Sequence, residues 1–467
     1  MKKKSFRFLS VLCASALIVS AFSGCQNNSA SSAGTSSKAS AASGTSSGKT
    51  FENKELNIAV FQGAYGRDYW DAVASDFMKK YPGTEIHVTA NPKLGDMIKP
   101  QISAGNPPDF IYLNQGETSG VTQSLINDHQ LTDLSDIFNG KALDKDEPIK
   151  GEVLDGILGS TFCSPYGDGK IYLAPYNYGV EGLWYNKTYF DKKGYEPPKT
   201  WDDFFAMADK AKADGRALFT YQGIYPSYLE EMLVPNLYSA GGETAVKQFD
   251  DYSLDWNGDA ATKALSVFDK ISKNNLLMQG TVAMNHTQAQ TAFMQGKAMF
   301  IVNGSWFEGE MKDAPRESGF EFGFAGVPAF KKGDSVNALA SIEQMYIPTK
   351  AKNPELAKEF MRFIYTDDSV KLNGEKAKAV LCVKGAADKV KSYLTPSSYD
   401  CYSAVEKGMK LVVSTLNPVA KGSTINPSDE IYKPISDLMN GQLTVKKWAN
   451  DLNGVYKNIR NGLKAQG

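Results

Sequence analysis

Between residues 55 and 113 the chain alternates strand-like runs with amphipathic segments, and this alternation limits the folds open to it. The strand-like runs predict strands at 56–61, 85–90 and 109–113. The amphipathic segments predict helices at 67–81 and 96–104, each followed by Gly or Pro. Strands separated by helices favour a parallel or mixed sheet. The sequence therefore predicts an α/β protein with helices on both faces of its sheet.

The same alternation continues further along the chain. Thr200 is placed to cap a helix, with Asp203 at the capping-box position. A helix over 287–295 precedes a buried strand at 298–302, and Asn353 with Pro354 is typical of a helix start. Long helical stretches dominate the C-terminal third. We expect Trp184 and Trp201 to belong to the core because each lies within a regular apolar pattern.

The first 25 residues have the features of an export signal. Basic residues precede an apolar run at 8–22, and Ser23-Gly24-Cys25 follows. A Cys at this point resembles the bacterial lipobox, in which the Cys is acylated and becomes the new N-terminus. We therefore expect residues 1–24 to be removed and Cys25 to hold the protein by lipid on the outer face of the cell membrane. The alternative is an ordinary signal peptide with an incidental Cys.

Residues 25–50 predict a flexible linker, because Ser, Ala, Gly and Thr cannot form a packed core. The chain has 51 Lys and Arg against 52 Asp and Glu, with a net charge of −1. No basic excess is present to neutralise phosphates, so we expect no nucleic-acid partner. After the signal, no apolar run reaches the ~18 residues that span a bilayer.

Cysteine and histidine usage gives little support to a metal site or a cofactor. Past the lipobox only Cys163, Cys382 and Cys401 remain, and the three histidines are far apart in sequence. The sequence has no CxxC pair and no HExxH, so we expect no metal and no cofactor. It leaves open whether Cys382 and Cys401 form a disulfide or remain buried thiols.

An ordered set of short motifs covers most of residues 55–467. The set comprises GNPPD at 105–109, LAP at 173–175, LWYNK at 183–187, PKTWDDF at 198–204, AF at 292–293 with GKAM at 296–299, NGSW at 303–306, and KNPELA at 352–357. This order resembles the extracellular solute-binding proteins of carbohydrate ABC importers, the group that contains maltose-binding protein. GAYGRDY at 63–69 and QLTDL at 130–134 are similar to the branch that binds N-acetylglucosamine and diacetylchitobiose.

The resemblance implies a periplasmic-binding-protein-like fold, with two α/β lobes joined by a hinge that the chain crosses several times. The first lobe would comprise 55–168 and 328–378, and the second 175–325 and 384–467. A carbohydrate would bind in the cleft between them and pass to the transmembrane subunits of an ABC permease. The resemblance implies a monomeric binding protein that is not an enzyme.

Sugar binding needs flat aromatic surfaces and planar polar side chains, because a sugar has apolar C–H faces ringed by hydroxyls. The resemblance places a stacking Trp at Trp306 and a second stacking residue at Tyr221. Asn114 and Gln115 follow a predicted strand and offer amides. The remaining candidates are Tyr65, Tyr178, Glu181, Glu343 and Gln344. For each residue the alternative is ordinary packing or turn formation.

Two other functions remain open at this point. A surface glycoside hydrolase would need two carboxylates about 5–10 Å apart, and no motif assigns such a pair. A solute-binding protein for a peptide or a phosphorylated cargo is also compatible with the motifs. Phosphate recognition favours clustered arginines, and the arginines after the signal are scattered in the sequence.

Overall fold

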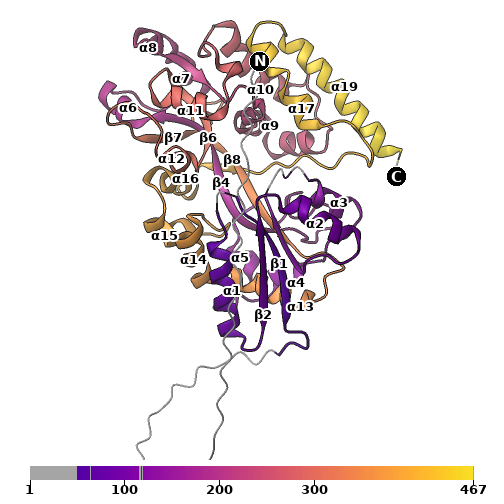
Figure 1. Ribbon diagram of the computed structural model, residues 1–467. Coiled ribbons are helices and arrows are strands. Elements are labelled where there is room, and N and C mark those ends of the chain that lie inside the picture. Colours follow the sequence, from indigo (N-terminus) through magenta and orange to yellow (C-terminus); the bar gives the residue numbers. More distant parts are fainter. Residues whose placement is uncertain (1–49, 64, 115–116, 118, 466–467) are drawn as a thin grey trace, which may run out of the picture. The chain divides into compact units, whose positions relative to one another are not determined.

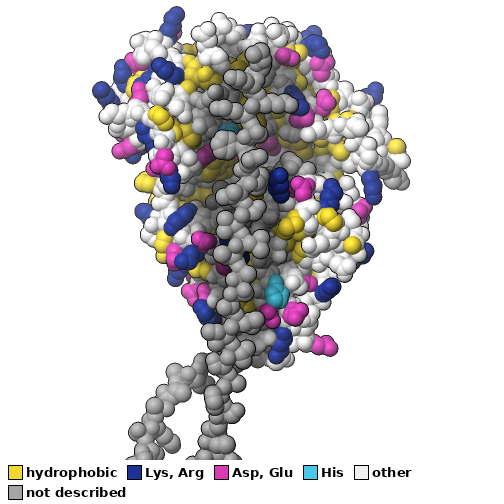
Figure 2. Space-filling view, in the orientation of Figure 1, with side chains coloured by type: hydrophobic (Ala, Val, Ile, Leu, Met, Phe, Trp, Pro, Cys, Tyr) yellow, Lys and Arg dark blue, Asp and Glu magenta, His cyan; other side chains and the backbone are white. Residues whose placement is uncertain are grey.

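The computed structural model describes residues 50–465 except for 64, 115–116 and 118 (Figure 1). The signal segment, Cys25 and the linker up to residue 49 lie outside the described residues. The described residues all belong to one compact unit. Among them, no helix is both long enough and apolar enough to cross a membrane. Figure 2 shows acidic and basic side chains interspersed over the face in view.

A single mixed sheet organises the described residues. Its nine strands include a path in the order β2-β1-β3-β8-β4-β6-β5, with β7 paired to β4 and β9 paired to β8. The strands are β1 (Glu55–Phe61), β2 (Glu85–Asn91), β3 (Phe110–Leu113), β4 (Ala174–Asn186), β5 (Ala217–Thr220), β6 (Ala298–Gly304), β7 (Phe322–Gly326), β8 (Asn337–Tyr346) and β9 (Lys410–Val412). The predicted mixed α/β architecture is confirmed.

The strands β1, β2 and β3 are parallel, as the alternation of strands and helices predicts. The helices that follow β1 and β2 are α1 (Asp68–Lys80) and α2 (Leu94–Ser103), close to the predicted ranges. Trp70, Val73 and Phe77 repeat along one face of α1 and are buried in the core. Shorter helices complete this region at α3 (Val121–Asn127), α4 (Ser135–Asn139) and α5 (Ile149–Glu152).

The long strands β4 and β8 join this region to the rest of the sheet. They are antiparallel to each other, and Val180 pairs with Ala340 between them. β8 continues antiparallel onto β3, while β4 continues antiparallel onto β6 and β7. The sheet is therefore continuous between the region of β1–β3 and the region of β5 and β6, which Figure 1 shows on either side of β4 and β8.

Helices α6 to α12 pack around β5, β6 and β7. The helix predicted after Thr200 is interrupted at Met207, and the Thr200–Asp203 capping box is present. Gly242 breaks α9. Its φ of 68° is a backbone conformation that only a residue without a Cβ adopts freely. The bounds are α6 (Lys187–Lys193), α7 (Trp201–Ala206), α8 (Ala208–Ala213), α9 (Glu230–Asp250), α10 (Asp259–Lys273), α11 (His286–Met294) and α12 (Phe307–Glu310). A short 3-10 helix, η1 (Pro226–Leu229), leads into α9.

The predicted start of a helix at Asn353 is confirmed. Asn353 Oδ1 accepts a hydrogen bond from Leu356 N, and its Nδ2 donates to the carbonyls of Asn53 and Glu55 at 3.0 and 2.8 Å. The C-terminal helices are α13 (Pro354–Ile364), α14 (Asp367–Ala377), α15 (Ala386–Val390), α16 (Pro396–Glu406), α17 (Pro427–Tyr432), α18 (Ile435–Met439) and α19 (Val445–Lys464).

Several core residues settle points that the sequence left open. Cys163, Cys382 and Cys401 are free thiols, all buried, so Cys382 and Cys401 do not form a disulfide. Trp184 and Trp201 are buried, as predicted. Two further short 3-10 helices lie at η2 (Thr281–Ala283) and η3 (Lys391–Tyr393).

Candidate functional site

A cavity of about 1370 Å³ lies along the centre of the sheet. Its walls come from the loop after β1, from β3, β4 and β8, from the start of α9, from the segment after β6, and from the residues around α16. The polar and aromatic residues that line it include Tyr65, Tyr112, Asn114, Glu181, Tyr228, Glu230, Glu231, Ser305, Trp306, Glu310, Ser341, Glu343, Thr395 and Ser398. This volume exceeds the ~300–1,000 Å³ of typical small-molecule pockets, so the cavity has room for a ligand larger than a monosaccharide.

The period of two along β8 decides which of its side chains face the cavity. Leu339, Ser341 and Glu343 alternate along the strand, and all three line the cavity. On the neighbouring strand β4, Gly179 pairs with Ser341, and Glu181 pairs with Leu339. The Glu181 carboxylate accepts a hydrogen bond from Ser341. Two adjacent strands thus bring a carboxylate and a hydroxyl together at the cavity wall.

The Trp306 side chain lies close against the backbone of the sheet. A Cβ at Gly179 would stand 2.8 Å from the indole atom Cζ3, and a Cβ at Gly304 would overlap the six-membered ring. Gly304 is also the residue paired with Glu181. The absence of side chains at these two glycines allows the ring to rest directly beside Glu181.

Hydrogen bonds fix the turn that carries Trp306. Ser305 Oγ lies 3.0 Å from the Tyr402 hydroxyl, and the Tyr402 hydroxyl donates to the carbonyl of Tyr178 at 2.8 Å. The backbone N–H of Val180 donates to Ser305 Oγ at 3.4 Å. These bonds tie the end of β6 to β4 and α16, so the aromatic ring is held in place before any ligand arrives.

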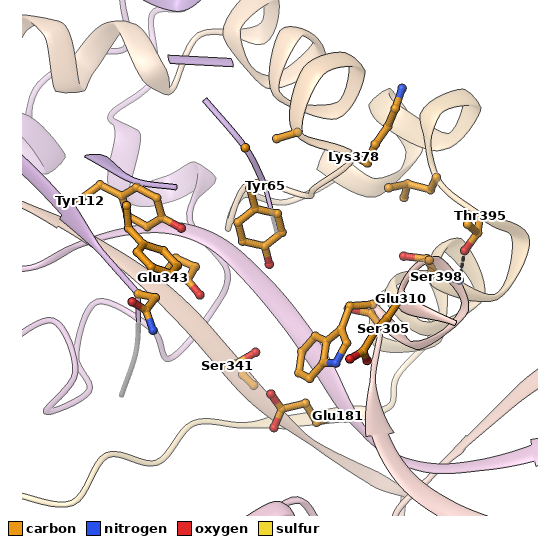
Figure 3. Close-up of a pocket in the computed structure, with 18 of the residues that line it drawn as sticks. Tyr65, Tyr112, Glu181, Ser305, Glu310, Ser341, Glu343, Lys378, Thr395 and Ser398 are labelled. Carbon is orange, nitrogen blue, oxygen red and sulfur yellow. Dashed lines mark hydrogen bonds between the residues drawn. The ribbon is translucent and has the colours of Figure 1, made fainter. Parts of the chain in front are cut away.

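Figure 3 shows that Tyr65, Tyr112 and Glu343 gather on one side of the cavity, and that Glu181, Glu310 and Ser305 lie on the other. Tyr112 is buried and stacks on Trp70, with ring centroids 5.4 Å apart and planes at 26°. Burial, followed by the charge of Glu343, raises the pKa of both Tyr65 and Tyr112 well above the ordinary value. Both phenols therefore keep their protons; Tyr112 donates its proton in a hydrogen bond to Glu343, and Tyr65 can donate to a ligand.

Three glutamates on the opposite wall have raised pKa values. Burial raises the pKa of Glu181 to about 8 and that of Glu230 to about 7. Burial, followed by the charges of Glu181 and Glu230, raises the pKa of Glu231 well above its ordinary range. Charge on these carboxyls is therefore unfavourable in the empty cavity, because they are removed from water and repel one another.

The structure brings five of the predicted residues to the cavity and places three elsewhere. Trp306, Asn114, Tyr65, Glu181 and Glu343 line it. Gln115 lies outside the described residues. The three residues that lie elsewhere are Tyr178, Tyr221 and Gln344, whose side chains are buried in the core or in the sheet.

These three placements correct our expectation, and each has a physical reason. Tyr178 is three residues from Glu181 on the same strand, so the two side chains face opposite sides of the sheet. The Tyr178 ring packs edge-on against Tyr402, with ring centroids 4.9 Å apart. Gln344 follows the cavity-facing Glu343 and therefore points to the other face of β8. Tyr221 stacks on Phe219 in the core, with ring centroids 6.2 Å apart, and in this stretch of the chain Tyr228 lines the cavity instead.

Sequence reasoning missed several lining residues, and they divide into two groups. Ser341 and Tyr112 carry a usable signal, because Ser341 lies two residues before the candidate Glu343, and Tyr112 lies on a predicted strand two residues before the candidate Asn114. Glu231, Thr395 and Ser398 carry none, since helices distant in the sequence bring them to the cavity. Their position depends on the tertiary fold alone.

Comparison with known proteins agrees with this architecture. The family model for "Bacterial extracellular solute-binding protein" matches residues 63–371. The diacetylchitobiose binding protein NgcE of Streptomyces coelicolor is 26% identical over 343 residues, which cover 71% of this chain and 70% of that protein. A maltooligosaccharide ABC transporter solute-binding lipoprotein of Streptococcus pneumoniae is 25% identical over 412 residues, covering 86% of this chain and 87% of the relative.

The solved structures give the same fold. The apo form of RafE from Streptococcus pneumoniae superposes with a TM-score of 0.68 at 18% identity, covering 88% of this chain and 100% of that one. The two-lobed, periplasmic-binding-protein-like fold is therefore confirmed. Because the family model matches well over half of the residues, this chain belongs to the family of bacterial extracellular solute-binding proteins.

Proposed function

We propose that this protein is the sugar-binding receptor of an ABC importer and that it holds an oligosaccharide in the cavity. One observation carries the proposal: Trp306 rests over backbone glycines beside Glu181 and Ser341, so a flat apolar surface adjoins hydrogen-bonding groups. A pyranose ring presents the complementary pattern of C–H faces and hydroxyls. The Tyr65 phenol supplies a donor from the other wall, which it shares with Glu343.

An N-acetylglucosamine-containing ligand such as diacetylchitobiose is the favoured sugar within this proposal. Its support is the name of NgcE, a diacetylchitobiose binding protein, together with the motif at 63–69. The pneumococcal relative is named for maltooligosaccharides, so maltose-type sugars form the comparison set.

The predicted lobes and anchor belong to the same proposal. We place the first lobe at 55–168 and 328–378, the second at 175–325 and 384–467, and the hinge at β4 and β8. Ligand binding would close the lobes and present the loaded monomer to the permease. Cys25 would carry the lipid, which mass spectrometry of the protein extracted from membranes would reveal as a diacylglyceryl adduct.

A thermal-shift screen of the purified protein tests the receptor function. A ligand that binds only the folded state raises the melting temperature as it saturates the site. We expect a shift with diacetylchitobiose and none with maltose or cellobiose, and we expect Trp306→Ala to abolish it. A shift with cello- or xylo-oligosaccharides alone would reject the sugar but keep the receptor.

The same samples test the hydrolase alternative. After incubation, chromatography of the sugar should return it unchanged, because the proposed receptor performs no covalent chemistry. Cleavage by the pure protein that is lost in Glu181→Gln would instead favour a glycoside hydrolase. If no glycan in a broad panel shifts the melting temperature, the receptor proposal fails.

A further inference from the structure

The start of α9 places two glutamates at the cavity wall. Glu230 and Glu231 lie in the first turn of the helix, where acidic side chains are favoured by the helix dipole. The helix dipole accounts for a solvated carboxylate at this position but not for a buried one. Glu231 is only 4% exposed, and its Oε2 has no hydrogen-bond partner among the described residues. A buried polar atom without a partner is costly, which points to a ligand that completes it.

Glu231 faces other acidic groups from every neighbouring element. Glu181 on β4 and Glu230 on α9 act on it electrostatically, and Glu310 of α12 acts with it on Tyr228 of η1. Tyr432 of α17 lies beside Glu230 and contributes a phenol. The cluster of Glu181, Glu230 and Glu231 is called the carboxylate cluster below.

The cations that line the cavity are engaged elsewhere or lie at its exposed edge. Arg67 pairs with Asp71 at 2.8 Å, and Lys376 pairs with Glu375 at 2.8 Å. The Lys378 ammonium lies 5.3 Å from the centre of the Tyr393 ring, and Lys312 is exposed. No ion pair joins the carboxylate cluster to a described lysine or arginine that lines the cavity, so nothing in the empty site offsets charge on these carboxyls and they are held protonated there.

We propose, on the basis of the receptor function above, that the cavity also accepts an amino sugar with a free, protonated amine, that the carboxylate cluster binds this amine, and that this form binds more tightly than the N-acetylated sugar. An ammonium group donates up to three hydrogen bonds, satisfies Glu231 Oε2 and stabilises the ionised form of the carboxyls around it. A neutral hydroxyl or an acetamide N–H donates one hydrogen bond and brings no positive charge. The Trp306 surface next to Glu181 selects a sugar ring over an aliphatic amine.

Calorimetry on the purified protein tests the proposal with a matched pair of sugars. These are the β-1,4-linked glucosamine disaccharide and its N-acetylated counterpart, diacetylchitobiose. We expect the free amine to bind about tenfold tighter or more at a pH where it is protonated. Because the carboxyls are held protonated in the empty cavity, binding of the amine should release about one proton, measured in two buffers with different ionisation enthalpies.

Two isosteric variants separate the cluster from a general effect of charge. Glu231→Gln should weaken binding of the glucosamine disaccharide by about tenfold and change that of diacetylchitobiose by less than about threefold. Glu243→Gln removes an exposed glutamate from the same helix and should change neither affinity. Circular dichroism melts of both variants show whether each one folds.

The outcomes are distinct. Equal or tighter binding of diacetylchitobiose without proton release would overturn the amine assignment and leave the receptor function intact. Binding of putrescine, a diamine without a ring, as tight as that of the amino sugar would overturn the assignment to a sugar. If neither disaccharide nor any other glycan binds, the receptor function itself fails.

Discussion

At the scale of single residues, the site depends on which side of a strand each side chain occupies. Glu181 and Gly179 share one face of β4, whereas Tyr178 lies on the other. Glu343 faces the cavity and its neighbour Gln344 does not. A shift of one position along the strand therefore decides whether a polar side chain can contact a ligand or packs on the other face of the sheet.

Gly304→Ala should weaken ligand binding even though the glycine has no side chain to contact a sugar. Its new methyl group would occupy the position of the Trp306 ring and displace the indole from the sheet. We expect a loss of about fivefold to tenfold in affinity, the scale of one aromatic contact. Titration calorimetry checks it, with Gly454→Ala as the control because a Cβ there meets open space. Unchanged affinity would show that the ring position is irrelevant.

Glu181→Gln should flatten the dependence of stability on pH in the unliganded protein. Burial raises the pKa of Glu181 in the folded state from 4.5 to about 8, so between these values the folded state binds the extra proton. Its contribution to the free energy of unfolding is therefore complete below pH 4.5 and is lost as the pH rises toward 8.

The free energy of unfolding that Glu181 contributes falls by at most about 1.4 kcal/mol per pH unit. Urea unfolding at pH 5, 6, 7 and 8 measures it, with Glu243→Gln as the reference. The wild-type protein and Glu243→Gln should lose stability in parallel, and Glu181→Gln should lose less. Identical slopes for all three would contradict the folded-state pKa.

The sequence could predict the strand-borne part of the site but not the part contributed by distant helices. Trp306, at the end of a predicted buried strand, was placed correctly at the cavity. Strict alternation would also have rejected Tyr178 once Glu181 was chosen, and would have proposed Ser341 from Glu343. Glu231 had no such signal, because nothing local shows that the first turn of α9 faces β4.

At the scale of elements, helix starts were predictable because their causes are local. The Thr200 capping box and the Asn353 cap are both present where the residue types predict them. The break at Gly242 inside α9 and the division of the helix after Thr200 were not foreseen, since tertiary packing determines them.

Asn353→Ala should destabilise the fold more than Thr200→Ala, although both remove a helix cap. The Thr200 side chain makes local hydrogen bonds only. The Asn353 side chain also donates from Nδ2 to the carbonyl of Asn53, which precedes β1, and to that of Glu55, which begins it. We expect about 1 kcal/mol for Thr200→Ala and about 2–3 kcal/mol for Asn353→Ala, measured by urea unfolding. Equal losses would show that the bonds to the β1 region add nothing.

At the scale of the whole molecule, the continuous sheet sets how the fold can move. β4 and β8 pair on both sides of an irregularity between Pro175 and Tyr178, in the region that contains the cavity wall. Under the proposed function, closure would bend this pair of strands rather than break it, because broken ladder bonds would leave polar groups unpaired. The lobe boundaries themselves were predicted from resemblance and stay a prediction.

Small-angle X-ray scattering should show compaction when the ligand binds. We expect the radius of gyration to fall by about 1 Å on saturation with the sugar identified by thermal shift, as hinge closure brings the cavity walls together. Trp306→Ala at the same sugar concentration is the control and should remain at the unliganded value. A constant radius with proven binding would mean that the ligand enters without closure.

The burial of the thiols has a practical consequence. After residue 25 the cysteines are Cys163, Cys382 and Cys401, all buried, and burial raises the pKa of each well above its ordinary value. Buried, protonated thiols react slowly with maleimides. A single cysteine introduced at the cavity rim, at the exposed Ser227 for example, would therefore accept a fluorescent dye selectively. The protein could then serve as an optical sensor that reports its own ligand in solution.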